Sequence, residues 1–510
     1  MFELLKGICV LLAETLYIVG GEFFYIREDG LAVGYPYNST YSLDLSTSWS
    51  PKDVRFNMID NGDSPVFNRP SLWPAPDGES FYSFNGDVSQ AGHYTIRDPP
   101  PTSQLWQFTP DGKSNGTWSL AGTAPSLIQV QTARSTFGNG SAYILGGFTD
   151  WRTTRLYGYD NTYIGSGNGI VSYSMNSQTW QNQSMAGVAP TGWWYEGELH
   201  WVDNLGGSGL VVALGGVTAQ PLPQSAGETL VPFDYVSFFN PVTGEWRNQS
   251  TTGAIPTPRR RACSVGVLGD NGTYGIILHG GSILPADTHF ETVPQATIDL
   301  DQVWVLSLPS FTWYKSNYQP ANARFLHTCN VPGNPPRCQM VAVGGIIPQL
   351  EYYLEPRDPW PQGLGIFDLT EMQWRDNYDA NADAYETPRM VKDGIAKEGM
   401  YPKEWDSPEV PWNRRQQKGR HRRRSRRRRG WCRCPAGWTE NGPAKEKTTL
   451  APSLRSKNGY EKPELEAAAA PPGSTQTGAP QRAHNHAELN NDPLTAAELA
   501  APNNRPVHEM

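Results

Sequence analysis

A repeated marker pair constrains the fold of this 510-residue chain more than any other feature. An apolar stretch ends in a Gly-Gly pair five times, and Asn85-Gly86 fills the one gap in the series. Successive markers lie 65, 61, 69, 65 and 64 residues apart, and the five glycine pairs begin at Gly20, Gly146, Gly215, Gly280 and Gly344. A tryptophan follows each marker after 29 to 34 residues, at Trp49, Trp118, Trp180, Trp246, Trp313 and Trp374. Two markers in register predict six structural repeats.

Each repeat is predicted to form four strands, and the fifth repeat shows this most clearly. Its apolar segments are Cys263–Leu268, Gly275–His279 and Val303–Leu306, and a fourth begins at Trp313. Asp270-Asn271-Gly272, between the first two segments, is a hairpin signal because Asn and Gly accept the backbone angles of tight turns.

Six such sheets are predicted to pack face to face around an axis, because one sheet alone leaves its apolar faces exposed. The chain is therefore expected to be an all-β, six-bladed propeller, with the tryptophans wedged between blades. The paired glycines fit crowding near the axis or backbone with positive φ. Closure of the ring is expected to rest on packing of the first blade against the sixth, unless residues 379–400 donate a strand. The blades are expected at about 7–55, 65–122, 130–185, 195–250, 260–318 and 324–378.

The repeat resembles that of the kelch family, whose units carry a Gly-Gly pair, a downstream Tyr and a downstream Trp. The resemblance covers about residues 7–378 and is greatest to fungal kelch proteins with an extracellular propeller, one membrane span and a low-complexity tail. It depends on Pro258–Cys263, Leu326–Cys329 and Cys338–Gly345. The resemblance implies a non-enzymatic binding or scaffold protein that is secreted or anchored to the cell membrane.

Signals for the cellular compartment conflict. Glu3 and Lys6 make the N-terminus a poor signal peptide, and no apolar run of 18 residues or more predicts a membrane span. The span that the family implies is thus not found, and an intracellular kelch adaptor stays an alternative. Six glycosylation sequons in or beside predicted loops favour a secretory glycoprotein, at Asn38, Asn115, Asn139, Asn182, Asn248 and Asn271.

The C-terminal part of the chain departs from the repeat. Residues 379–412 are interpreted as a transition segment, 413–439 as an Arg-rich linker and 440–510 as a disordered low-complexity tail. Residues 414–429 carry ten Arg and one Lys, although the net charge of the chain is −8. The Arg run fits a nuclear-localisation or nucleic-acid patch, a lipid-binding segment, a solvated linker, or a frame error in the gene model. The acidic remainder predicts no nucleic-acid surface on the propeller.

The cysteines predict at most one local disulfide. Cys329 and Cys338 bracket a predicted hairpin, so a bond between them is one possibility and two buried thiols are the other. Cys432 and Cys434 are too close in sequence for an ordinary zinc pair.

Motifs for enzymatic chemistry are lacking: the sequence has no Gly-x-Ser-x-Gly elbow, no His-Glu-x-x-His helix and no phosphate-binding Walker loop. We therefore expect neither catalytic residues nor a cofactor. The enzyme alternative is a galactose-oxidase-like copper protein, although no second domain follows the last blade. Its histidine ligands would come from the five in the propeller, at His93, His200, His279, His289 and His327.

Two groups of residues are candidate binding sites for an unidentified protein or glycan ligand. Arg69, Arg134, Arg261 and Arg324 stand at or just before predicted innermost strands, where they would attract an anion to the channel mouth. The alternative is that each arginine caps backbone carbonyls of a neighbouring blade. Aromatic side chains in predicted loops, which would contact a sugar or a partner or else pack between blades, are Trp193, Trp194 and Tyr195, with Trp151 and Trp201 nearby.

Overall fold

The computed structural model describes most of the chain up to residue 406. The described ranges are 3–5, 7–26, 32–36, 39–89, 99–100, 102–112, 115–155, 165–166, 168–189, 193–203, 205–219, 227–283, 299–318, 323–347 and 358–406. The Arg-rich linker and the predicted disordered tail lie outside these ranges, as do His93, His289 and Asn38.

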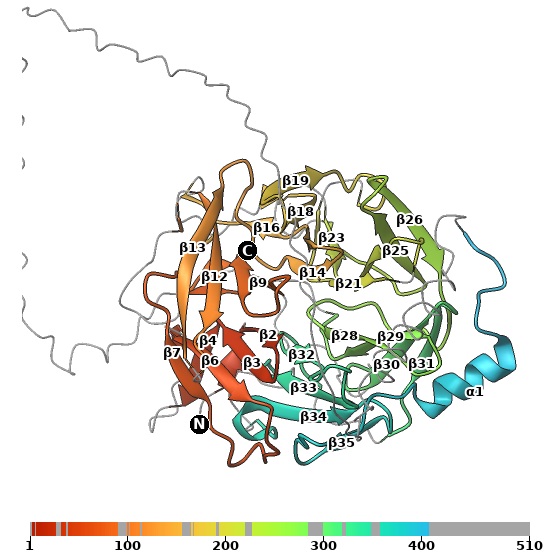
Figure 1. Ribbon diagram of the computed structural model, residues 1–510. Helices are drawn as coiled ribbons and strands as arrows, with labels where there is room; N and C mark the ends of the chain where they lie inside the picture. The colour runs from red at the N-terminus through yellow and green to blue at the C-terminus, as the bar shows by residue number, and fades with distance from the viewer. Residues whose placement is uncertain are drawn as a thin grey trace, which may run out of the picture. The chain divides into compact units, whose positions relative to one another are not determined.

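Six antiparallel sheets, each built on four consecutive strands of one repeat, follow one another along the chain and form a six-bladed, all-β propeller (Figure 1). The first three blades are β2 (Ile8–Leu12), β3 (Thr15–Val19), β6 (Ser39–Asp44) and β7 (Asn57–Asp60); β9 (Ser71–Pro74), β10 (Phe81–Phe84), β12 (Ser103–Pro110) and β13 (Gly116–Ala124); and β14 (Arg134–Gly138), β15 (Ser141–Leu145), β18 (Ile170–Ser174) and β19 (Thr179–Gln183). The last three are β21 (Glu198–Val202), β22 (Leu210–Leu214), β25 (Tyr235–Asn240) and β26 (Glu245–Ser250); β28 (Cys263–Leu268), β29 (Tyr274–His279), β30 (Val303–Leu308) and β31 (Thr312–Lys315); and β32 (Thr328–Asn330), β33 (Gln339–Val343), β34 (Leu364–Asp368) and β35 (Gln373–Arg375).

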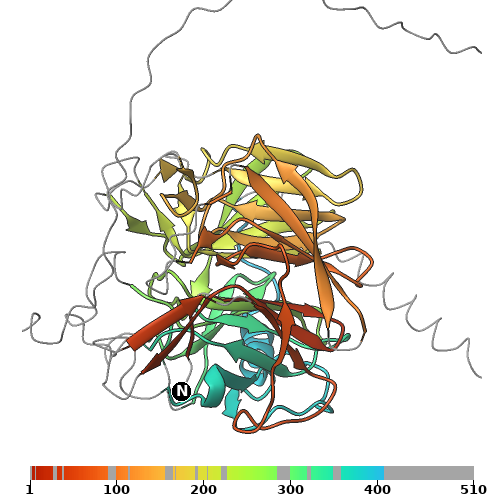
Figure 2. The same cartoon turned by 90° about the vertical axis from the view of Figure 1, so that its left-hand side faces the viewer.

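The first strand of each blade lies nearest the axis, and the fourth lies at the outside of the ring (Figure 1). Each first strand contacts the first strand of the next blade, and β32 of the sixth blade contacts β2 of the first. Viewed from the side, neighbouring twisted sheets lie face to face (Figure 2). This arrangement buries the second strand of every sheet almost entirely, as expected when blades pack face to face.

Shorter elements join the blades. They are β1 (Glu3–Leu5) with β4 (Glu22–Ile26) and β5 (Ala32–Pro36), β8 (Phe67–Asn68) with β11 (Asp87–Val88), β16 (Phe148–Thr149) with β17 (Gly165–Ser166), β20 (Trp194–Tyr195) with β23 (Val217–Thr218) and β24 (Thr229–Leu230), β27 (Thr252–Gly253), a 3-10 turn (Pro361–Gly363) and α1 (Arg389–Glu398). The strand β27 pairs parallel to β31, so the connection from the fourth blade adds a fifth strand to the fifth blade.

The six glycine markers all adopt left-handed backbone. Gly146 has φ +56°, and a Cβ there would lie 1.8 Å from the carbonyl oxygen of Trp194. In the degenerate marker, Asn85 takes the same conformation at φ +65°, which Asn tolerates better than most residues. The repeat pattern leaves crowding and positive φ as alternative reasons for the paired glycines. At Gly146 both apply.

The repeated tryptophans pack between neighbouring blades, as predicted. Trp118 in the second blade donates through Nε1 to Thr40 Oγ1 in the first, at 2.9 Å. Trp313 in the fifth donates to the carbonyl oxygen of Phe233, which belongs to the fourth, at 3.0 Å.

Packing between the first and sixth blades closes the ring. One apolar cluster contains Leu16 and Ile18 of the first blade together with Val341 and Ile366 of the sixth. Trp49 stacks on Tyr378 at 4.9 Å, and the two residues also form an isolated backbone bridge.

The segment after the last blade packs on the propeller through a helix rather than a strand. Val391 of α1 is buried in a cluster with residues of the fifth and sixth blades. Further on, Trp405 packs edge to face against Phe311 at 5.8 Å. Apart from an isolated bridge at Ala384, residues 379–400 add no strand.

Candidate functional site

A ring of five residues narrows one end of the propeller axis. Each residue stands two positions before a first strand and has φ between +52° and +60°, so all share one strained conformation. Backbone N–H groups of three of them each donate to the ring residue of the preceding blade, at 3.0 to 3.2 Å. We call this set the mouth ring: Arg69, Thr132, Glu196, Arg261 and Leu326. The space that the ring lines is only about 20 Å³, which is room for little more than a water molecule.

The arginines of the mouth ring are paired with carboxylates. Arg69 lies 3.0 Å from Asp87, and Arg261 donates to Glu196 at 2.9 Å. Burial alone would raise the pKa of Glu196, but Arg260 and Arg261 outweigh it and lower that pKa to about 2. Glu196 is thus ionised, and it offsets the positive charge that an anion would need.

The other two predicted arginines occupy different positions. Arg134 begins β14 and donates to the backbone carbonyls of Gly197 and Ala262, at 3.2 and 3.1 Å, which is the capping role considered as the alternative. Arg324 is fully buried, and it pairs with Asp358 at 2.8 Å and stacks over Trp360 at 3.4 Å. Of the two interpretations of these arginines, Arg134 fits the capping one, and the other three have carboxylate partners, as buried guanidinium groups require.

The predicted aromatic loop is also buried. Trp193, Trp194 and Tyr195 are only 5%, 1% and 5% exposed. The indole of Trp194 donates to the carbonyl oxygen of Gly215 at 2.8 Å. Inter-blade packing, the second of the two alternatives, therefore describes these residues, and they offer no stacking surface.

Beyond the mouth ring, the space along the axis widens into a cavity of about 490 Å³ lined by residues of all six first strands. We call it the channel cavity.

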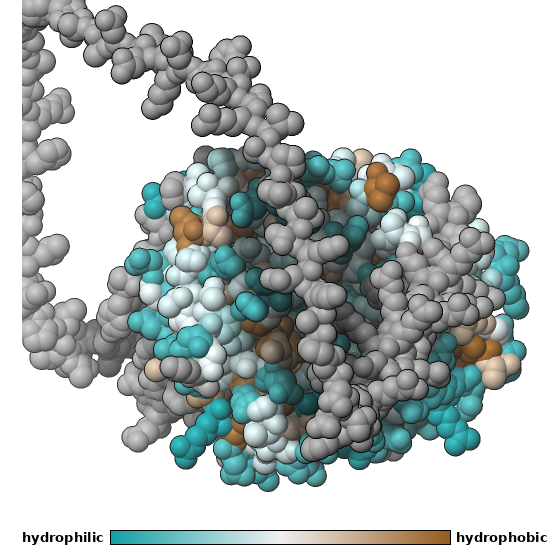
Figure 3. Space-filling view, viewed as in Figure 1, coloured by the Kyte–Doolittle hydropathy of each residue, from teal (hydrophilic) through white to brown (hydrophobic). Residues whose placement is uncertain are grey.

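Figure 3 shows that apolar residues on the face viewed in Figure 1 form small separate patches among polar ones. Phe137, 48% exposed, is an exposed aromatic residue in the cavity lining.

Three polar side chains of β21 and β28 form a hydrogen-bonded chain in the channel cavity. Ser264 Oγ donates to Glu198 Oε2 at 2.7 Å, and His200 Nε2 lies 2.7 Å from the same Oγ. Glu198 Oε1 lies 3.4 Å from Arg134. Glu198 and His200 are two positions apart in β21, so their side chains point to the same face of the strand.

The protonation of this chain is set by burial. Burial lowers the pKa of His200 to about 4, so its imidazole is neutral near pH 7. Burial raises the pKa of Glu198, against the opposing effects of Arg134 and Ser264. The Ser264 hydroxyl donates its hydrogen bond to Glu198, so its oxygen accepts from His200. His200 is therefore placed to donate to the hydroxyl rather than to remove a proton from it. The arrangement suits recognition of hydroxyl groups and differs from a nucleophile–base pair.

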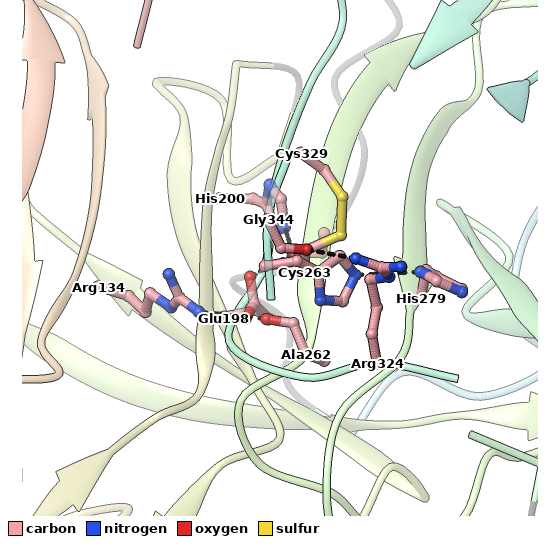
Figure 4. The surroundings of a disulfide bond; sticks show 11 residues. Arg134, Glu198, His200, Ala262, Cys263, His279, Arg324, Cys329 and Gly344 are labelled. Carbon is pink, nitrogen blue, oxygen red and sulfur yellow. Dashed lines mark hydrogen bonds and ion pairs between the residues drawn. A yellow bond between two sulfur atoms is a disulfide. The ribbon is translucent and has the colours of Figure 1, made fainter. Parts of the chain in front are cut away.

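The disulfide differs from the predicted one. Cys263 of β28 is bonded to Cys329 of β32, which joins the fifth and sixth blades (Figure 4). Cys338 is a free thiol. Within the sixth blade, Cys329 pairs across the hairpin with Ala342. Cys338 is four residues before Ala342, so this register places it too far from Cys329 for a disulfide. Neither a Cys329–Cys338 bond nor a pair of buried thiols is correct.

Two of the five propeller histidines come together beside this disulfide. His279 Nδ1 lies 3.0 Å from His327 Nε2, and both rings are buried. Cys263, His279 and His327 form a group whose potential ligand atoms all lie within 4.8 Å of one another. Because Cys263 is bonded to Cys329, it cannot form the Cys-Tyr thioether that a galactose-oxidase-like site requires.

The described sequon residues are accessible to different degrees. Asn115 and Asn139 lie in hairpin turns and are exposed. Asn182 and Asn248 are also exposed but lie in the outer strands β19 and β26 rather than in loops. Asn271, in the β28–β29 turn, is half-buried and accepts hydrogen bonds from Thr273 and Thr387.

Sequence reasoning missed Glu198, Ser264 and Phe137, and it considered His200 only as a copper ligand. The signal that was present is the alternation of polar residues along innermost strands, such as Glu198 and His200. Without the register between blades, this alternation does not reveal which residues meet across the axis.

Comparison with known proteins supports the repeat seen in the sequence. No family model matches the chain. The chain is similar to a protein of Arthroderma benhamiae described as a kelch repeat-containing protein, with 26% identity over 430 residues. The match covers 76% of this chain and 59% of that relative, so the chain spans about three-fifths of the relative's length.

Within the described residues, no helix combines the length and the apolar character needed to cross a bilayer.

Proposed function

We propose that this chain, a kelch-repeat β-propeller, is a non-enzymatic binding protein that takes an uncharged, hydroxyl-rich ligand, a sugar unit of a glycan, into the channel cavity. Kelch repeats were predicted from the glycine and tryptophan markers, and the similarity to a kelch repeat-containing protein confirms them. The observation that carries the proposal is the Glu198–Ser264–His200 chain, with its carboxylate and imidazole buried, in a cavity of about 490 Å³.

The polar groups of the cavity match sugar hydroxyls in kind. A carboxylate, a serine hydroxyl and a neutral imidazole together provide donors and acceptors without a free charge. Glu198 Oε1 is buried and accepts no hydrogen bond from the described residues, and Arg134 is its charged neighbour at 3.4 Å. Its ion pair with Arg134 disfavours both anionic and cationic ligands.

An aromatic side chain complements these polar groups. Phe137 lines the cavity from β14 and is 48% exposed, so its ring offers a surface for the apolar face of a sugar. Trp201 lies in the same lining but stacks on Tyr143 at 5.5 Å with parallel rings, so its role is packing.

A cell-surface or secreted location is part of the proposal. The Cys263–Cys329 disulfide supports an oxidising compartment, since such bonds are rare in proteins of the cytosol. The exposed sequon residues Asn115 and Asn139 support glycosylation in the secretory pathway.

A glycan array followed by calorimetric titration of the best ligand tests the binding proposal. Phe137→Ala is expected to weaken binding about 5- to 30-fold, in line with about 1–2 kcal/mol for an aromatic contact residue. Ser264→Ala should weaken it further, because it leaves Glu198 and His200 without their shared partner.

Val242→Ala is the matched control, because Val242 is an apolar residue, 73% exposed and outside the cavity lining. It should bind like the wild type. A protein that captures no glycan, or a glycan whose affinity is the same in the Phe137→Ala and Ser264→Ala variants as in the wild type, refutes the proposal.

A further inference from the structure

The residues around the Cys263–Cys329 disulfide form a second cluster with potential chemistry. Cys263 and His279 are directly opposite each other in the β28–β29 pairing. His327 and Cys329 are two residues apart at the start of the sixth blade. The two pairs are joined by the disulfide (Figure 4). They are also joined by the 3.0 Å contact between His279 Nδ1 and His327 Nε2.

The histidines carry polar atoms that the described protein leaves unused. His279 Nε2 and His327 Nδ1 are buried, and no described residue forms a hydrogen bond with them. A buried polar atom without a partner costs about 1–3 kcal/mol in typical proteins. The remaining nitrogen of each ring, His279 Nδ1 and His327 Nε2, faces the other histidine at 3.0 Å, and these two are the nitrogens placed to share an ion.

The two histidine nitrogens that face each other have nearly the spacing that a zinc ion requires. Two nitrogens held by one tetrahedral zinc ion, at about 2.0–2.1 Å each, lie roughly 3.3–3.4 Å apart. His279 Nδ1 and His327 Nε2 are 3.0 Å apart, a few tenths of an ångström less than this spacing. The potential ligand atoms of Cys263, His279 and His327 lie within 4.8 Å of one another.

We propose that reduction of the Cys263–Cys329 disulfide converts this cluster into a Cys2His2 zinc site formed by Cys263, Cys329, His279 and His327. The fourth ligand is Cys329, because its sulfur is bonded to that of Cys263 in the oxidised protein. Two thiolates and two neutral imidazoles are a common ligand set of structural zinc.

The conversion is balanced as a thiol–disulfide exchange followed by metal binding. A dithiol reductant transfers two electrons to the disulfide, which breaks the S–S bond and yields two cysteine thiols and an oxidised dithiol. Binding of Zn²⁺ then releases two protons, one from each thiol.

Charge makes metal binding depend on reduction. Arg324 and Arg259 both act on His279 by Coulomb repulsion of positive charge, so a dication bound by two imidazoles alone is disfavoured. Two thiolates cancel the charge of the ion and remove this obstacle. The site is also reachable, because Cys329 lines the channel cavity and His327 lines the space at the mouth ring.

Cobalt titration of the purified protein tests the proposal. The protein is reduced with dithiothreitol, freed of it by anaerobic gel filtration, and titrated with Co²⁺, whose visible bands report tetrahedral geometry and whose near-ultraviolet absorption reports thiolate ligands. Reduced wild type should bind stoichiometric Co²⁺, displaceable by Zn²⁺, and the oxidised protein should bind none. His327→Gln and Cys263→Ser should each weaken binding by more than about 100-fold, since even changes behind metal ligands cost roughly 10- to 100-fold.

Cys338→Ser is the control, because Cys338 is a free thiol outside the cluster and its loss should leave the cobalt spectrum unchanged. Far-ultraviolet circular dichroism follows the fold in every sample. Absence of the thiolate absorption in reduced wild type overturns the proposal, as does equal binding by the oxidised protein or by His327→Gln. Reduced protein that unfolds and is not restored by Zn²⁺ also overturns it. None of these results bears on glycan capture by the oxidised protein.

Discussion

Loss of the Cys263–Cys329 disulfide should lower the thermal stability of the propeller by a predictable amount. The two cysteines are 66 residues apart in sequence, so the bond closes a loop that contains one whole blade repeat. In the chain-entropy model a loop of this length stabilises the folded state by about 4 kcal/mol, because the unfolded chain is constrained. The bond also joins first strands of adjacent blades, which must separate when the ring opens.

The perturbation is the double substitution Cys263→Ala and Cys329→Ala, measured by differential scanning calorimetry with a chelator present. If the roughly 370 residues of the propeller unfold as one unit, an unfolding entropy of about 2.1 cal/mol/K per residue converts 4 kcal/mol into a Tm decrease of about 5 °C. Cys338→Ser should leave Tm within about 1 °C, because this thiol forms no bond.

A reductant provides the second arm of the experiment. Dithiothreitol should lower the Tm of wild type to near that of the double variant, and it should leave the variant unchanged. A double variant with the Tm of the oxidised wild type would refute the reasoning, and so would a reductant that lowers both proteins equally.

Three further predictions concern backbone, pH and modification. Gly146→Ala should destabilise the propeller by more than about 2 kcal/mol in thermal unfolding, because its Cβ would lie 1.8 Å from the Trp194 oxygen, whereas Gly122→Ala meets nothing within 4 Å and should not. His200 binds a proton near pH 6.5 when unfolded but only near pH 4 when folded, so stability should fall by up to about 3 kcal/mol as pH drops through this window, and a His200→Gln variant should show a smaller fall. Asn139→Gln should remove one glycan from protein secreted by a eukaryotic host, seen as a mobility step on deglycosylation, and an unchanged pattern would count against modification at this exposed residue.

The repeat was readable from sequence because each marker answers a local physical need that recurs in every blade. Gly146 must adopt positive φ beside a neighbouring backbone, and glycine is the residue that does so without strain. Asn85, read as a degenerate member of the series, has the same backbone conformation. Trp118 and Trp313 occupy the space between blades, which only a large side chain fills.

The surroundings of the predicted binding residues could not be read from the sequence, for a common reason. Arg261 and Arg324 occupy equivalent places in the repeat, but one lies in the mouth ring against Glu196 and the other is buried against Asp358. Trp194 looked like a loop aromatic and is 1% exposed. The sequence near each residue contains no sign of the partner that covers it, because that partner comes from a segment distant along the chain.

The sequence by itself determined the six blades, the order of their strands and the tryptophans that pack between them. These features depend on local backbone angles and on a large side chain that recurs in each repeat. Only the tertiary structure decided which side chains meet across the axis. Cys263 and Cys329, 66 residues apart, are adjacent because β28 and β32 are neighbouring first strands. Glu198 and Ser264 meet for the same reason, from β21 and β28. Contacts between blades depend on the rotation that ring closure imposes, and that rotation is a property of the whole ring rather than of any one repeat.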